Sequence, residues 1–206
     1  MNIDRFITEF VILAPPFLMA LTVHELAHGY VAKLLGDPTA SQAGRLTWNP
    51  LKHLDPMGVL CFFLIKIGWA KPVPVNAANF KNPRQDMVFV SLAGPGANVF
   101  LAFISAIAAK MMVAMPVLPA VVMLPLLQMV AASIWNNVML AIFNFLPIPP
   151  LDGSKVLSGV LPVQMASIYA KLEPFGFILL LVLFYSGFLS AILTPIITYA
   201  HNFLAQ

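Results

Sequence analysis

Four long apolar runs, separated by shorter polar stretches, dominate the pattern along the chain. They cover residues 10–32, 87–109, 121–145 and 175–200. A helix needs about 20 apolar residues to cross the hydrocarbon core of a bilayer, so each run predicts a membrane-spanning helix. The fourth run carries no charge. It fits either one long tilted helix or two shorter ones separated near Ser186–Gly187, and the sequence leaves both open.

A shorter apolar run lies between the first two spans. Residues 57–65 are too few to cross the bilayer, and they predict a re-entrant or half-buried segment. The stretch before it, 37–56, is polar and rich in turn-forming residues. In the stretch after it, 68–76, two prolines separated by one valine favour an extended, edge-strand-like conformation. Residues 57–76 together therefore predict a re-entrant or extended membrane-associated segment.

The composition sets the class of protein. The chain is 60% hydrophobic and 9% charged. A soluble domain of this length cannot bury so much apolar side chain. The sequence therefore predicts an all-α polytopic membrane protein with about four to six transmembrane helices. The formal net charge of +3 gives no indication of nucleic-acid binding, and we interpret the basic residues as markers of topology instead.

The positions of the basic residues predict the orientation. If 57–65 does not cross the membrane, residues 33–85 and 151–172 lie on the same side. These two stretches contain nine of the eleven basic residues, namely Lys33, Arg45, Lys52, Lys66, Lys71, Lys81, Arg84, Lys155 and Lys171. Arg5 and Lys110 lie on the other side. Because cytoplasmic loops are enriched in Lys and Arg, the basic side is predicted to be cytoplasmic and the N-terminus to lie outside.

The first apolar run contains the ionisable motif His24-Glu25-Leu26-Ala27-His28. On a helix, histidines four residues apart lie on one face, so both imidazoles can reach one Zn²⁺. Glu25 points about 100° round the helix, where it can accept a proton from a water molecule at the metal. This short pattern also arises by chance in soluble helices. Ionisable groups within a membrane span are costly, however, and their presence indicates a function.

A hydrolytic zinc site commonly has three protein ligands, so the two histidines require a third donor. The candidates include His53, His201, Asp55, Asp86, Asp152 and Glu173. Asp152 follows the proline-rich stretch 147–150 and precedes Gly153. The prolines end a helix and the glycine permits a sharp turn, so the carboxylate can fold back toward the bilayer. Asp152 can equally serve as the N-cap of the next helix.

The region around Asp152 reads Asn144-x-x-Pro147-x-Pro149-x-Leu151-Asp152-Gly153. Together with an HExxH motif inside a span, it resembles the site-2 protease family of intramembrane zinc metalloproteases. Segments 49–56, 68–76 and 93–98 also resemble its compact bacterial and archaeal branch, which lacks a PDZ domain. The resemblance extends to about residue 160. It implies a single integral membrane protease domain over 1–206, with its catalytic core at about 7–160 and C-terminal transmembrane segments at about 173–203.

The resemblance implies a metalloendopeptidase with one Zn²⁺ per chain, held by His24, His28 and Asp152. The ion activates water and polarises the scissile carbonyl, and Glu25 acts as the base. Asn144 is expected to bond to the developing oxyanion or to the substrate backbone, although a polar contact between spans also explains it. A ligand set of two histidines and one aspartate suits Fe²⁺ or Co²⁺ as well.

The expected partners are the lipid bilayer and a transmembrane protein or peptide whose helix is locally unwound at the cleavage site. The resemblance implies a multi-pass protein of a prokaryotic plasma membrane, and the oligomeric state stays open. Asn76, Asn98 and His53 are candidate substrate contacts. Asn76 ends an extended stretch to which a substrate strand can add. Each has a structural alternative, namely an ordinary loop, a contact between helices and a cap, respectively.

Two other functions fit part of the pattern. A metal or ion transporter can use the same His and Asp residues, but such proteins commonly contain repeated broken helices, and no repeat is evident here. A catalytically inactive homologue that binds membrane helices is the other alternative. The presence of Glu25 beside all three expected ligands argues against it.

Overall fold

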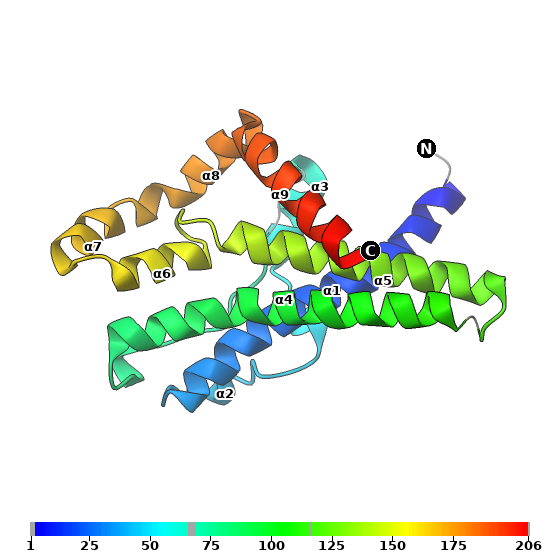
Figure 1. The fold of residues 1–206 in the computed structure, drawn as a ribbon. Helices are drawn as coiled ribbons and strands as arrows, with labels where there is room; N and C mark the ends of the chain where they lie inside the picture. The colour runs from blue at the N-terminus through cyan, green and yellow to red at the C-terminus, as the bar shows by residue number, and fades with distance from the viewer. Residues whose placement is uncertain (1–2, 66–68, 116, 206) are drawn as a thin grey trace.

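The computed structural model describes residues 3–65, 69–115 and 117–205. Its described elements are almost entirely helical, and the only strand-like pairing among them is one isolated β-bridge (Figure 1). Four stretches are long and apolar enough to cross a membrane: Ile7–Leu34, Pro83–Ala114, Ala120–Asn144 and Val163–Tyr185. The predicted all-α polytopic membrane fold is therefore confirmed.

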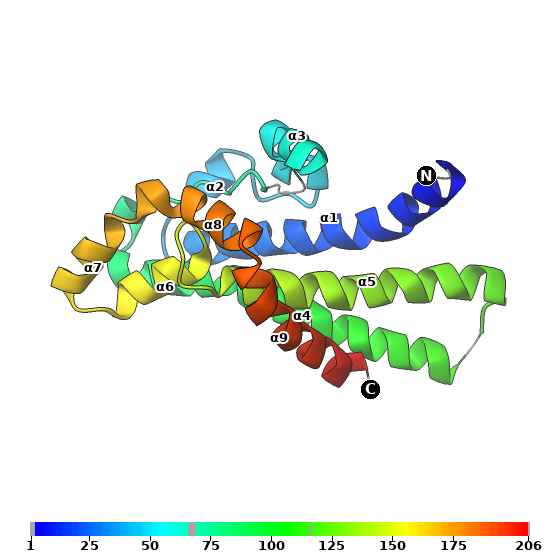
Figure 2. The same ribbon diagram turned by 90° about the horizontal axis from the view of Figure 1, so that it is seen from above.

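Three long helices form the centre of the molecule: α1 (Ile3–Leu34), α4 (Pro83–Ala114) and α5 (Ala120–Asn144). Each packs against the other two, and Figure 2 shows α1 and α5 side by side with α4 next to α5. The end of α1, the start of α4 and the end of α5 lie at the same end of this bundle. The helices thus alternate in direction, as expected for successive crossings of a bilayer.

Many large apolar side chains point away from this bundle. Among them are Phe10, Phe100, Phe103, Val113, Val121 and Phe177, each exposed by more than 40%. Such a surface is unfavourable in water, but lipid chains can cover it at no hydrophobic cost. The exposed apolar side chains and the long helices both indicate a lipid environment.

The fourth apolar run forms two helices, α8 (Gly176–Tyr185) and α9 (Phe188–Ala205). They are separated at Gly187, whose φ of 76° lies in the left-handed region that favours glycine. This decides between the two alternatives that the sequence left open. Helix α9 packs against both α4 and α5, and the shared core consists of Ala102, Ala106, Ile134, Val138, Leu189, Leu193 and Ile197.

The predicted polar connection at 151–172 contains two helices, α6 (Asp152–Val160) and α7 (Val163–Ala170). Helix α6 packs on the first turns of α4. The Arg84 guanidinium donates to the carbonyl of Ser158 at 3.2 Å, and Gly159 leaves room for Val88. Because Asp152 begins α6, this contact with α4 also locates the Asp152 carboxylate.

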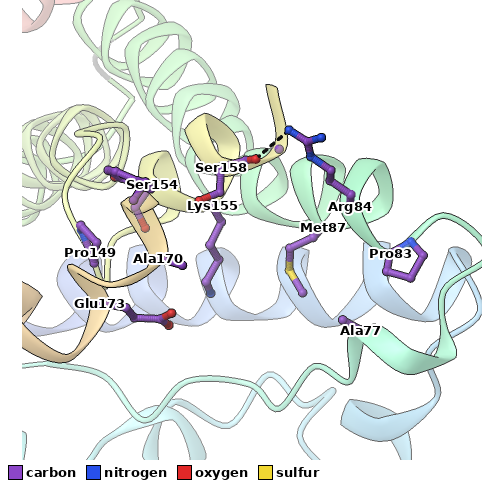
Figure 3. A pocket seen from close by; sticks show the side chains of 12 residues that line it. Ala77, Pro83, Arg84, Met87, Pro149, Ser154, Lys155, Ser158, Ala170 and Glu173 are labelled. Carbon is purple, nitrogen blue, oxygen red and sulfur yellow. Dashed lines mark hydrogen bonds between the residues drawn. The ribbon is translucent and has the colours of Figure 1, made fainter. Parts of the chain in front are cut away.

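A pocket of about 420 Å³ opens between the start of α4 and helices α6 and α7 (Figure 3). Lys155 extends into it, with Met87 and Glu173 nearby. Its lining includes neither the two histidines of the HExxH motif nor Asp152. The pocket is therefore separate from the candidate metal ligands.

The short apolar run forms α3 (Pro56–Ile65), whose ten residues are too few to cross a bilayer, as predicted. The two remaining short elements before it are α2 (Thr39–Gln42) and η1 (Pro50–His53). Residues 69–76 contain no helix, and Ala70 forms an antiparallel bridge with Leu54. The extended conformation predicted for 68–76 is confirmed for these residues; Gly68 lies outside the described part of the chain.

Candidate metal centre

His24, His28 and Asp152 meet at one point, although 124 residues separate His28 from Asp152 in the chain. The Nε2 atoms of His24 and His28 lie 3.0 Å apart. Asp152 Oδ2 lies 3.2 Å from Nε2 of His24 and 3.1 Å from Nε2 of His28. All three side chains are buried. The structure therefore brings together the three ligands that the resemblance implies.

The position of the proton on each imidazole ring follows from the hydrogen-bond partner of its Nδ1 atom. His28 Nδ1 lies 2.7 Å from the carbonyl oxygen of Val90, which can only accept a hydrogen bond, so Nδ1 carries the proton. His24 Nδ1 likewise lies 2.6 Å from Oδ1 of Asn98. In a neutral imidazole the second nitrogen then carries a lone pair. Both Nε2 atoms therefore present lone pairs to each other and to the Asp152 carboxylate.

This arrangement fits a metal ion. The lone pairs of the two Nε2 atoms and of Oδ2 would repel one another in a buried site unless a cation lay between them. Oδ2 receives no hydrogen bond from the described residues. Tetrahedral zinc, with bonds of about 2.0–2.2 Å, holds its ligand atoms roughly 3.4 Å apart, close to the spacing observed here. Two nitrogens and one carboxylate oxygen are a donor set that zinc accepts.

Gly94 allows α4 to approach the two histidines. A methyl group at this position would lie 2.6 Å from Cε1 of His28 and 2.7 Å from Cε1 of His24. Any side chain there would displace the rings or push the helices apart. The contact of Gly94 with the candidate ligands becomes visible only in the structure.

Asp152 reaches the histidines because of the way α5 ends. Helix α5 stops at Asn144, and the proline-rich stretch 147–150 leads into α6 without a helical turn between them. Gly153 passes so close to the carbonyls of Phe145 and Leu146 that a Cβ could not fit. Asp152 is the first helical residue and Leu151 the N-cap. The Asp152 carboxylate therefore faces the histidines and does not cap α6.

Glu25 lies on α1 beside the metal ligands and faces the extended stretch 71–76. Its Oε2 accepts a hydrogen bond of 2.8 Å from the backbone N–H of Val73. The side chain is 7% exposed. The extended stretch thus holds one carboxylate oxygen. The other oxygen, Oε1, accepts no hydrogen bond from the described residues. Sequence reasoning found Glu25 but not Val73, which has no functional side chain.

Two buried charges hold the extended stretch in place. The Arg45 guanidinium donates to the carbonyls of Lys71 at 2.7 Å and Pro72 at 3.2 Å. The Asp37 carboxylate accepts from the backbone N–H of Asn76 at 2.7 Å and from the Asn79 amide at 2.7 Å. These bonds tie the loop after α1 to the stretch that contacts Glu25.

The hydrogen bonds of the extended stretch limit the addition of a substrate strand to it. The backbone N–H of Lys71 donates to His53, that of Val73 to Glu25 and that of Asn76 to Asp37. Residues 72 and 74 are prolines and have no N–H. Within 71–76, only Val75 has an N–H without a partner among the described residues. A substrate strand that adds here would therefore pair mainly through carbonyl groups of the stretch.

The other predicted site residues lie around this centre. Asn144 ends α5, and its amide donates to the carbonyl of Leu140 at 3.0 Å. Asn98 is fully buried and bonded to His24. His53 is also fully buried, and its Nε2 bonds to the carbonyl of Thr47 at 2.9 Å. Asn76 caps the short helix η2 (Ala77–Asn79). Of these four, only Asn98 is bonded to a candidate ligand.

Comparison with known proteins identifies relatives of the chain. The chain is 41% identical over 94% of its length to the Bacillus subtilis protein named "Putative zinc metalloprotease YwhC", and the match covers 91% of that protein. It is 30% identical over 85% of its length to "Putative zinc metalloprotease Rip2" of Mycobacterium tuberculosis, covering 67% of that protein. The Mycolicibacterium smegmatis protein of the same name is 29% identical over 86% of the chain, and the match covers 68% of that protein.

The chain belongs to the site-2 protease family of metalloproteases. No family model and no solved structure matches it. In this member of the family, the HExxH helix is α1, and the aspartate that completes the three-residue cluster begins α6.

The close approach of Gly94 to both histidines gives a first testable prediction. Gly94→Ala should lower zinc affinity by at least about tenfold, because the added methyl group displaces both ligand rings. Gly96→Ala is the matched control, since a Cβ at Gly96 meets no atom within 4 Å. Zinc content after equilibrium dialysis measures both. Equal zinc content in the two variants would contradict the contact described here.

Asp37 gives a second prediction, about pH. Burial acts to raise the pKa of this carboxyl, but hydrogen bonds from Thr39, Asn79 and Asn76 outweigh it and hold the pKa below its ordinary value of 3.8. The stabilisation by the carboxylate is therefore complete above about pH 4 and is lost as pH falls through the lowered pKa.

Near neutral pH, Asp37→Asn should lower the free energy of unfolding by about 1–3 kcal/mol, because the new amide cannot accept all the bonds that the carboxylate accepts. The difference between the two proteins should shrink in acid, where the wild-type carboxyl is also protonated. Thermal unfolding in detergent between pH 7 and pH 3 measures it. A difference that stays constant over this range would assign the effect to packing.

Proposed function

We propose that this protein is an intramembrane zinc metalloprotease that hydrolyses a peptide bond within or near the transmembrane helix of a membrane-protein substrate. The observation that carries the proposal is the convergence of His24 Nε2, His28 Nε2 and Asp152 Oδ2. These atoms meet among helices long enough to cross a bilayer, next to a glutamate on the same helix as the histidines. The membership of the chain in the site-2 protease family supports it.

In the proposed reaction, His24, His28 and Asp152 would hold a zinc ion, and this ion would act as a Lewis acid on the scissile carbonyl and would lower the pKa of water. Glu25 accepts the proton of the attacking water and delivers it to the leaving amine. The hydrogen bond from the Val73 N–H to Oε2 orients the carboxylate. Oε1 remains for the proton transfer.

Asn144 is proposed to act on the substrate. One amide proton is engaged by the carbonyl of Leu140, and the second remains for a substrate carbonyl or the oxyanion that develops from it. Its place at the end of α5, eight residues before Asp152, puts it on the segment that also supplies a ligand. Loss of this donor should slow the reaction without removing the metal.

The substrate in this proposal is a transmembrane protein or peptide. Its helix must open locally, because the hydrogen bonds of an intact helix shield the scissile carbonyl. Burial of the three ligand side chains and of Glu25 implies that the substrate backbone enters a confined site. His53 and Asn76, which support the loops around Glu25, are proposed to shape this entrance.

The central experiment compares wild type with Glu25→Gln on a model single-pass substrate in liposomes. We expect Glu25→Gln to retain zinc and to lose cleavage by about 10²–10⁴-fold, because only the proton acceptor is removed. Removal of zinc with a chelator should abolish cleavage by the wild type, and added zinc should restore it.

Glu173→Gln is the matched control, because Glu173 is exposed and is not among the three clustered residues. It should cleave like the wild type. Cleavage that persists in Glu25→Gln, or that resists the chelator, would sink the proposed mechanism. Zinc-loaded wild type that cleaves none of several substrates would favour a transporter or an inactive binder.

The orientation is also part of the proposal: a multi-pass protein of a bacterial plasma membrane, with its N-terminus outside and the active site nearer the cytoplasm. In a Cys61→Ser background, Val117→Cys should react with a membrane-impermeant maleimide added outside intact cells. Gln164→Cys should react only after the membrane is opened. Both native side chains are exposed. The reverse labelling pattern would invert the topology.

A further inference from the structure

We propose that Asn98 and Asn137 are positioning residues that hold the proton of His24 on Nδ1, and thereby keep the Nε2 lone pair directed at the metal. Neither residue touches the metal ligands' donor atoms; they act through a directed chain of hydrogen bonds that runs from α1 through α4 to α5. The inference rests on His24 being a metal ligand, as proposed above, but it does not depend on the reaction.

The orientation of the Asn98 amide is fixed by a backbone group. Its Nδ2 donates at 3.0 Å to the carbonyl of Ala20, which can only accept, and so the amide nitrogen must face α1 at this point. The amide oxygen then faces His24 Nδ1 at 2.6 Å. Ala20 lies one helical turn before His24, so Asn98 grips α1 at both the backbone and the ligand ring.

The orientation of the Asn137 amide is fixed in the same way. Its Nδ2 donates at 2.8 Å to the carbonyl of Ser133, one turn earlier on α5. Its oxygen therefore faces away from α5 and accepts the second Nδ2 proton of Asn98 at 2.8 Å. The chain runs in one direction, from the His24 ring through both amides to a backbone carbonyl, and each donor has an acceptor.

Both amides are fully buried, at 0% exposure. A buried amide without partners is destabilising in a protein interior, so such groups persist where their bonds are complete. Here the bonds are complete only if the proton of His24 lies on Nδ1. A proton on Nε2 would leave Nδ1 facing the Asn98 oxygen, lone pair against lone pair. The network therefore selects one of the two tautomers of His24.

The two ligand histidines are controlled differently. The tautomer of His28 is set by a single backbone carbonyl, that of Val90 on α4. The tautomer of His24 depends on two side chains on two different helices. Substitution at 98 or 137 should therefore change the tautomer of His24 and leave that of His28 unchanged. A general loss of packing does not produce this distinction.

The test measures zinc binding and ring protonation in Asn98→Leu, Asn137→Leu and the control Asn136→Leu. Leucine has the same number of side-chain heavy atoms as asparagine and the same branching at Cγ, but it offers no hydrogen bond. Asn136 is the neighbour of Asn137 on α5, and its side chain makes no hydrogen bond to the described residues. We expect zinc dissociation constants to rise about 10-fold or more for Asn98→Leu, by a smaller factor for Asn137→Leu, and not for Asn136→Leu.

Nitrogen-15 NMR of histidine-labelled, zinc-free protein in detergent reports the tautomer directly. The chain has four histidines, so substitution of each one assigns its signals. In the wild type, His24 and His28 should both show a protonated Nδ1. In Asn98→Leu and Asn137→Leu, His24 should populate the other tautomer, and His28 should not change.

A wild-type His24 with no proton on Nδ1 would overturn the inference even if a leucine variant failed to fold. It would also be overturned if both leucine variants folded and bound zinc as tightly as Asn136→Leu. Failure of the wild type to bind zinc would instead refute the proposed function. The two failures are thus distinguishable.

Discussion

Two imidazole nitrogens and a carboxylate oxygen lie about 3 Å from one another inside a helical bundle suited to a bilayer. With no cation among them, their lone pairs repel, and burial removes the water that would screen the repulsion. Much of the surrounding structure serves to hold these atoms together. Gly94 lets α4 approach the rings, and Gly153 with the neighbouring prolines turns Asp152 back toward them.

The supports of the site come from different helices and loops. Helix α4 supplies the groups that bond to both rings, Asn98 and the carbonyl of Val90, and it also carries Arg84, which fastens α6. The loops after α1 supply Asp37 and Arg45, which hold the extended stretch against Glu25. The proposed metal ligands and the proposed base are therefore positioned by separate parts of the chain, and a change in one need not disturb the other.

Sequence reasoning succeeded where the physical signal is local. The i, i+4 spacing of His24 and His28 needs only the period of a helix, and the long apolar runs need only the thickness of a bilayer. It singled out Asp152 from the adjoining prolines and Gly153, but it needed a resemblance to choose the ligand role over that of an N-cap. The break at Gly187 stayed open, since both one helix and two bury a similar apolar surface in lipid.

The sequence by itself determined the membrane class, three of the candidate spans, the extended stretch after α3 and the pair of histidines with its glutamate, since each follows from composition or from contacts within a few residues. The fourth span was predicted at 175–200, whereas the structure has it at Val163–Tyr185, which begins within the predicted polar connection. Only the tertiary structure showed that Asn98 bonds to His24, that Val73 bonds to Glu25 and that Gly94 lies against both rings. These contacts join residues that lie 48–74 positions apart in the chain. Val73 and Gly94 act through a backbone group and an absent side chain, so neither leaves a chemical signature in the sequence, and their roles depend on how the helices pack.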